Sequence, residues 1–98
     1  MASKYTRSAK GQECQVRMPG VCNFNPETTV LAHLNGAGMG MKHVDIHGAY
    51  CCSDCHRVLD GHAYAGHMGF DIDELKLMHH QGVIRTQQIM IREGVLKL

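Results

Sequence analysis

Four of the five cysteines stand in two pairs whose spacing suits a single metal ion. Cys52 and Cys55 form a C-x2-C knuckle, and one tight turn can bring two such thiolates to the same tetrahedral ion. Cys14 and Cys22, with seven residues between them, can supply the other two sulfurs. The pattern predicts a structural zinc site, with free buried thiols or a redox pair as alternatives. Cys51 is expected to be a small buried side chain, although a register in which it replaces Cys52 stays open.

A second set of residues could transfer protons or hold a catalytic metal ion. His56 follows the knuckle directly and Asp60 lies four residues further, so both share one face if the knuckle continues as a helix. His33 ends a β-branched and apolar stretch, and an imidazole there could face the helix and help to activate water. A structural His33 that only forms hydrogen bonds is the alternative.

Turns and hydrophobic periodicity predict the elements that position these residues. A turn at residues 18–20 lets the first cysteine pair meet across a short loop or hairpin. Residues 28–34 predict a strand, which a glycine-containing loop follows. A helix is expected over residues 53–60.

The C-terminal part predicts a long amphipathic helix over residues 71–93. Asp71 is a plausible N-cap with Glu74 at the capping-box position. Gly82 is expected to weaken this helix by about 1 kcal/mol. His79 and His80 also lie on it, and one of them is expected to be exposed.

Length and composition indicate one small domain that benefits from a metal ion. The chain has 98 residues, no Trp and only five aromatic side chains, so its core is near the lower limit for independent stability. The formal net charge is +1, and the sequence contains neither a secretory signal nor an apolar run as long as a membrane span. We therefore expect no membrane partner and a cytoplasmic protein, in which paired cysteines favour metal binding over disulfides. Residues 1–10 are basic and are expected to form a flexible arm.

The order of His33, His47 and the run from Cys52 to His56 resembles the HNH group of the ββα-metal (His-Me finger) endonucleases. This resemblance covers residues 12–62 and implies a zinc-stapled treble-clef domain. The Cys-x7-Cys spacing and the run Ala-His-Leu-Asn-Gly-Ala-Gly-Met-Gly resemble, over nearly the whole chain, the small prophage-encoded nucleases of the YbcO type.

The resemblance implies a role for each residue of the second set. His33 would be the general base that deprotonates the attacking water, and His56 and Asp60 would bind Mg²⁺ or another divalent ion. His47 stands where the family has its middle Asn, where an imidazole could orient the base or touch the scissile phosphate. The residue before the base is usually a metal-binding His or Asp, but here it is Ala32. The missing ligand would have to come from Asp45, His43 or His47.

The sequence thus predicts one α+β domain spanning residues 1–98, with a zinc-stapled core and a long C-terminal helix. The expected function is metal-dependent hydrolysis of DNA phosphodiester bonds, with Lys42 and Arg17 as candidate phosphate contacts. The alternative is a non-catalytic zinc module that binds nucleic acid or protein through a degenerate HNH site. The C-terminal helix could also pair two copies of the chain in a homodimer.

Overall fold

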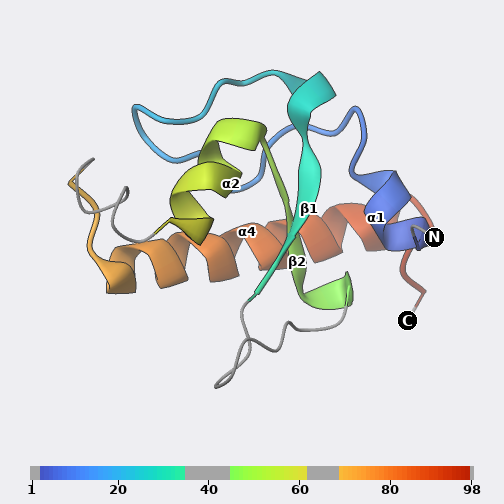
Figure 1. Cartoon of the computed structure of the whole chain (residues 1–98). Coiled ribbons are helices and arrows are strands. Elements are labelled where there is room, and N and C mark those ends of the chain that lie inside the picture. Colours follow the sequence, from blue (N-terminus) through green and yellow to red (C-terminus); the bar gives the residue numbers. More distant parts are fainter. Residues whose placement is uncertain (1–2, 35–44, 62–68, 98) are drawn as a thin grey trace.

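The computed structural model describes residues 3–34, 45–61 and 69–97 of this small mixed α/β domain (Figure 1). The predicted loop at residues 35–41, together with Lys42 and His43, lies outside these ranges. The elements in chain order are α1 (Lys4–Ser8), the 3₁₀ helix η1 (Pro26–Thr28), β1 (Val30–His33), the 3₁₀ helix η2 (Asp45–His47), β2 (Gly48–Cys51), α2 (Ser53–Asp60) and α4 (Ile72–Arg92).

A two-stranded antiparallel sheet forms the centre of the molecule. In its register, Val30 of β1 lies opposite Cys51 of β2, and His33 lies opposite Gly48. The other edge of β2 is also occupied, because the Gln15 N–H donates to the Tyr50 carbonyl at 2.7 Å. The segment that carries Cys14 therefore lies beside β2, opposite β1.

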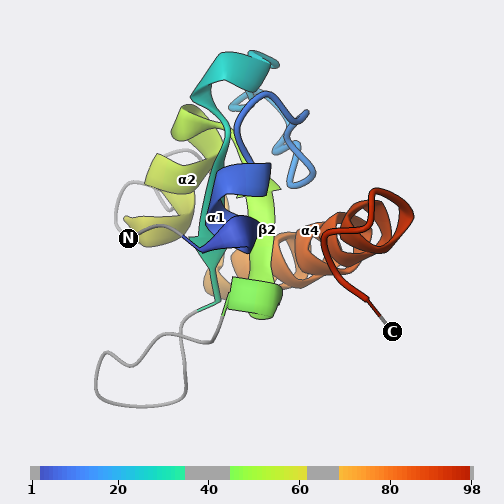
Figure 2. The ribbon, with the colours of Figure 1, turned by 90° about the vertical axis from the view of Figure 1, so that its right-hand side faces the viewer.

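Helix α4 packs directly on β2, and the predicted C-terminal helix is confirmed. Its capping box is formed by Asp71 and Glu74, as the sequence predicts. Seen along the edge of the hairpin in Figure 2, α4 runs on one side and α2 lies on the other. The Thr86 hydroxyl accepts a hydrogen bond from the Tyr50 N–H at 2.8 Å, which fixes the helix against the strand. Within the described ranges, no helix is both long and apolar enough to cross a membrane.

The N-terminal segment differs from the flexible arm that its basic composition suggests. Ser3 caps α1, and Ala9, which follows the helix, is almost completely buried. Ala9 packs in a cluster with Leu31, Tyr50 and Met90, residues that are far away in the sequence. Ser8 also hydrogen-bonds the Tyr50 hydroxyl at 2.8 Å. These contacts hold α1 on the domain, whereas its charged side chains remain on the outside.

Candidate metal centre and histidine site

The structure brings together the four cysteines that the spacing selects. The sulfurs of Cys14, Cys22, Cys52 and Cys55 all lie within 4.8 Å of one another, and three of the four residues are buried. The Cys22 and Cys52 sulfurs are 3.8 Å apart. Zinc–sulfur bonds of about 2.3 Å in a tetrahedron place two sulfurs about 3.8 Å apart, so the donor set fits a zinc ion in both chemistry and size.

Local structure explains how the two pairs meet. Cys52 is the N-cap of α2, and its sulfur accepts the Cys55 N–H at 3.4 Å, which keeps the knuckle tight. In the other pair, the Arg17 N–H points to the Cys14 sulfur at 3.4 Å. Backbone N–H donors of this kind stabilise the thiolate form of a metal ligand.

Without a metal ion, the buried thiols share their protons unevenly. Hydrogen bonds from the Cys51 and Cys55 thiols hold the pKa of Cys14 far below its ordinary value. The same hydrogen bonds raise the pKa of Cys51 and of Cys55, and burial raises the pKa of Cys22 to about 11. These shifts favour the thiolate form at Cys14 and the protonated thiol at Cys22 and Cys55. A bound dication would replace those protons and release them to solvent.

Cys51 is buried, as expected, and lies outside the four-sulfur group. The register in which Cys51 replaces Cys52 is therefore not the one the structure adopts. Cys51 packs in the same core cluster as Cys14 and Cys55, and its thiol lowers the pKa of Cys14. Cysteine spacing did not indicate this contact, because the contact depends on how β2 packs beside the segment that carries Cys14.

His33 at the end of β1 is paired with a carboxylate that spacing did not identify as its partner. Its Nε2 lies 2.6 Å from Asp45 Oδ1, and the Ser3 hydroxyl donates to the other oxygen of Asp45. Hydrogen bonds from Ser3 and from His33 lower the pKa of Asp45. An ionised Asp45 accepts the Nε2 proton, so Nδ1 becomes the ring atom able to take a proton. Both side chains are partly exposed, at 24% and 31%.

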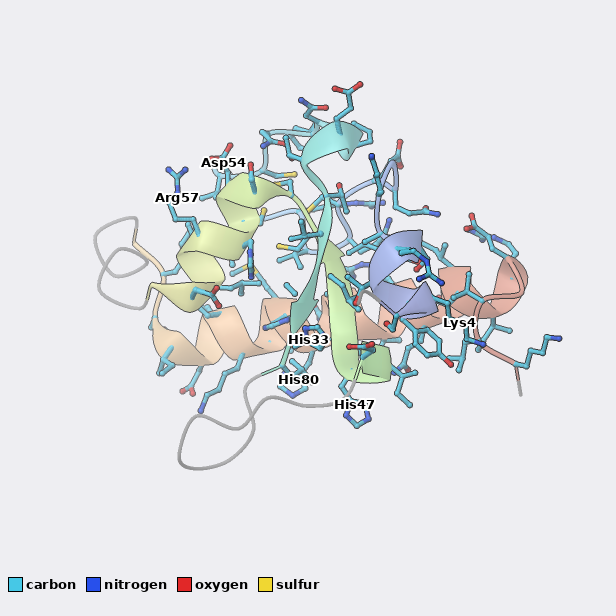
Figure 3. The ribbon with its side chains drawn as sticks, turned by 45° about the vertical axis from the view of Figure 1, so that its right-hand side comes forward. Lys4, His33, His47, Asp54, Arg57 and His80 are labelled. Atoms are coloured by element: carbon cyan, nitrogen blue, oxygen red, sulfur yellow. The ribbon has the colours of Figure 1, made fainter. Side chains whose placement is uncertain are left out.

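His47 lies near this pair. The Leu34 N–H donates to the His47 carbonyl at 3.1 Å. Figure 3 shows the side chains of His33 and His47 at the same end of the hairpin. The side chain that orients His33 is nevertheless that of Asp45, a residue that the sequence suggested only as a substitute metal ligand.

The second predicted pair also forms. His56 Nε2 and Asp60 Oδ2 are 3.1 Å apart on one face of α2, and the two side chains are 36% and 50% exposed. In the described part of the chain, however, the four cysteines are the one group of three or more His, Cys, Asp or Glu side chains close enough to hold a metal ion together. His33, His56 and Asp60 do not form such a group.

His79 of α4 contacts β1 and lies near the His56–Asp60 pair. Its Nε2 hydrogen-bonds the carbonyl of Ala32 at 2.8 Å, and it is buried while His80 is exposed, which confirms that one of the two is exposed. Burial lowers the pKa of His79, and the nearby charges of His80, Asp60 and His56 also act on it. Helical periodicity alone gave no reason to connect His79 with Ala32.

The comparisons with known proteins cover almost the whole chain. A family model described as "Putative nuclease YbcO" matches residues 3–95. Relatives with the same description from Escherichia coli K12 and from Enterobacteria phage 82 are each 43% identical over 94 residues, which is 93% of this chain and 94% of theirs. A solved structure, titled as a putative bacteriophage protein from Escherichia coli K-12, matches with a TM-score of 0.73 and 40% identity, over 91% of this chain and 98% of that chain. The chain therefore belongs to the YbcO family.

Proposed function

We propose that this chain is an endonuclease that hydrolyses DNA phosphodiester bonds in the manner of the HNH enzymes. The observation that carries the proposal is the hydrogen bond of 2.6 Å between His33 and Asp45, because it gives a strand-end histidine the orientation of a general base. The order β1, β2, α2 supports it, since the HNH resemblance implies a hairpin followed by a helix. The description of two relatives as nucleases agrees with this chemistry.

In this proposal the two cysteine pairs hold a structural zinc ion in a treble-clef arrangement. Four thiolates complete a tetrahedral site and leave no open position for substrate. The zinc would therefore stabilise the knuckle and α2, and through α2 would fix the position of His56 and Asp60. Its role is structural, and the reaction takes place elsewhere.

The residues of this chain can carry out the proton transfer. His33 Nδ1 takes a proton from the attacking water, and Asp45 stabilises the imidazolium that forms. Asp45 is itself held by Ser3, so the base keeps one orientation. His47 lies at the same end of the hairpin, and in this proposal its imidazole contacts the scissile phosphate.

A divalent ion, Mg²⁺ in the first instance, would be held by His56 and Asp60. They offer one nitrogen and one oxygen, and Ala32 contributes no side-chain ligand. Two protein ligands suit Mg²⁺, which usually keeps several waters and takes further oxygens from a phosphate substrate. Such an ion supplies positive charge to the phosphate and to the leaving oxygen.

The test is cleavage of supercoiled plasmid and branched DNA by zinc-loaded protein, with Mg²⁺, with Mn²⁺ or with neither. We expect metal-dependent nicking that His33→Ala abolishes while zinc content and the circular dichroism spectrum stay unchanged. His80→Ala is the matched control, because His80 is exposed and its Nδ1 hydrogen-bonds the Lys76 carbonyl of its own helix. Cleavage that survives His33→Ala would exclude His33 as the base.

A non-catalytic zinc module is the second candidate. Ala32 in the place of a ligand favours it, as does the lack of a second three-ligand group within the described residues. This alternative predicts that the protein binds nucleic acid or another protein but cleaves no DNA under any metal condition. The same experiment therefore decides between the two candidates.

A further inference from the structure

A polar cavity of about 420 Å³ lies between residues 11–17, the segment that carries Cys14, and the second half of α4. Three arginines line it, and Glu13 is the one acidic side chain of its lining. Gln15 and Gln88 add polar groups. Three guanidinium groups against one carboxylate give the lining a net positive charge, and a second carboxylate, that of Glu93, lies at its edge, where it accepts a hydrogen bond from Gln12 at 2.8 Å. The three arginines are Arg17, Arg85 and Arg92.

Two of the three guanidinium groups are fixed by main-chain carbonyls. Arg85 donates to the Gln15 carbonyl from Nε at 3.0 Å and from Nη2 at 2.7 Å. Arg17 donates from Nε to the Cys14 carbonyl at 3.0 Å. Each guanidinium carries five N–H groups, so several donors remain on both side chains after these bonds. Arginines fixed in this way lose less entropy when they bind an anion than mobile ones do.

The position of the cavity separates it from the His33 site. Gln15 bonds the edge of β2 that faces away from β1, whereas His33 lies on β1. The cavity can therefore hold a part of the substrate that is remote from the scissile bond. Arg17 also connects it with the metal centre, because the Arg17 N–H points to the Cys14 sulfur.

We propose that this arginine cavity binds the phosphodiester backbone of nucleic acid. The inference rests on the proposed nuclease function and adds a second anchoring point to it. The planar guanidinium fork matches two phosphate oxygens, and fixed donors in a concave site favour a phosphate over a diffuse counterion. A protein of such small net charge needs a local cluster of this kind to hold DNA, because affinity for the backbone depends on how many phosphates are neutralised.

The experiment measures binding without divalent ions, so that no cleavage interferes. A fluorescein-labelled DNA duplex is titrated with the full zinc-loaded chain at several salt concentrations, and anisotropy gives the affinity. Arg17→Gln and Arg92→Gln are the test variants, because both side chains are exposed and their loss spares the core. Arg57→Gln is the matched control, since Arg57 is also exposed but lies on α2 (Figure 3).

We expect each test variant to weaken binding several-fold, and to lower the slope of log affinity against log salt by about 0.9 for each lost phosphate contact. Arg57→Gln should leave both quantities unchanged. Equal effects of all three substitutions would overturn the proposal, because they would indicate diffuse attraction. A competition arm with inorganic phosphate identifies the ligand. If phosphate binding depends on Arg17 and Arg92 but duplex binding does not, the cavity is a site for free phosphate and the proposal is wrong.

The outcome is independent of cleavage. Binding that needs the arginines in a protein that never cleaves would support the cavity and reject the nuclease function. If the protein cleaves DNA but neither arginine substitution changes its affinity for DNA, the nuclease function is supported and the proposal for the cavity is rejected.

Discussion

At the scale of single residues, the chain of hydrogen bonds from Ser3 through Asp45 to His33 is the feature on which activity should depend most. Asp45→Asn keeps the size of the side chain but removes the negative charge that stabilises a protonated His33. We expect kcat for plasmid nicking to fall about 10- to 100-fold, as is usual when the partner of a functional histidine is lost. KM should change little, because Asp45 orients the base rather than binding DNA.

Asp73→Asn is the control for this prediction, because Asp73 is an exposed acid in the first turn of α4. Asp45→Glu should restore part of kcat, since it returns the carboxylate at a slightly different position. A loss confined to KM would show instead that Asp45 acts in substrate binding.

His79 gives a prediction about stability and pH. Burial lowers its pKa below the ordinary value of about 6.5, so the unfolded chain binds the proton more readily than the folded protein. The contribution of neutral His79 is therefore complete above pH ~6.5 and is lost as the pH falls toward the lowered value. His79→Asn should reduce the free energy of unfolding at pH 7.5 by about 1–3 kcal/mol, because the Ala32 carbonyl loses its donor.

Urea unfolding at pH 7.5 and pH 5.5 measures this effect. The difference between wild type and His79→Asn should shrink at the lower pH, whereas His80→Asn should follow the wild type at both. A constant difference would mean that His79 is not the group whose protonation costs stability.

At the scale of elements, Gly82 lies where α4 closely approaches the structure beneath it. A Cβ at this position would lie 2.9 Å from Val16 Cγ2 and 3.3 Å from the Ala49 Cβ. Gly82→Ala should therefore lower the free energy of unfolding by about 1–3 kcal/mol through overpacking, although Ala is the better helix former by about 1 kcal/mol. Thermal unfolding checks this, with the exposed neighbour change Gln81→Ala as a near-neutral control. A gain in stability would contradict the close packing.

The elements that the sequence predicts well are those whose signals are local. The helix at residues 53–60 follows directly from a knuckle, and α4 begins at a capping box between Asp71 and Glu74. Gly82 shows the limit of this reasoning. Sequence alone marks Gly82 as a weak point of the helix. The structure explains why a glycine stands there, because a larger residue would clash with Val16, which is far away in the sequence.

The candidate site shows the same division. The four cysteines could be selected from the sequence because metal chemistry requires that number and type of ligand. Asp45 could not be identified as the partner of His33, since their contact depends on the folded structure and no local sequence signal connects the two residues. The docking of α1 was missed for a similar reason, because Ala9 meets partners such as Tyr50 and Met90 only in the folded chain.

The outer face of α4 bears on the predicted homodimer. Leu77, Ile84 and Ile91 recur every seven residues and are 59%, 59% and 39% exposed. A seven-residue apolar repeat is typical of helices that pair. We predict a concentration-dependent dimer in sedimentation equilibrium that Ile84→Lys converts to a monomer, with Gln81→Lys as the exposed control. A monomer at all concentrations would remove the dimer from consideration.

At the scale of the whole molecule, the metal centre should decide whether the chain is folded. The four candidate ligands Cys14, Cys22, Cys52 and Cys55 pack in the main core cluster, or directly against it, in a domain with few large side chains. In small metal domains the free energy of zinc binding is largely the free energy of folding. Removal of the ion by a chelator should therefore abolish the cooperative thermal transition, and added zinc should restore it.

The cysteines allow a matched pair of variants for this last prediction. Cys22→Ser removes a ligand and should reduce the zinc content of the purified protein from one ion per chain toward none. Cys51→Ser changes a sulfur outside the ligand group, so zinc should stay bound and stability should fall by only about 1–2 kcal/mol. Because the pKa of Cys22 is raised to about 11 without metal, its thiol must lose a proton when zinc binds. Zinc affinity should consequently rise with pH between 6 and 8, as measured by chelator competition. Equal zinc content in both serine variants would show that the fourth ligand is not Cys22, and the treble-clef assignment would fail with it.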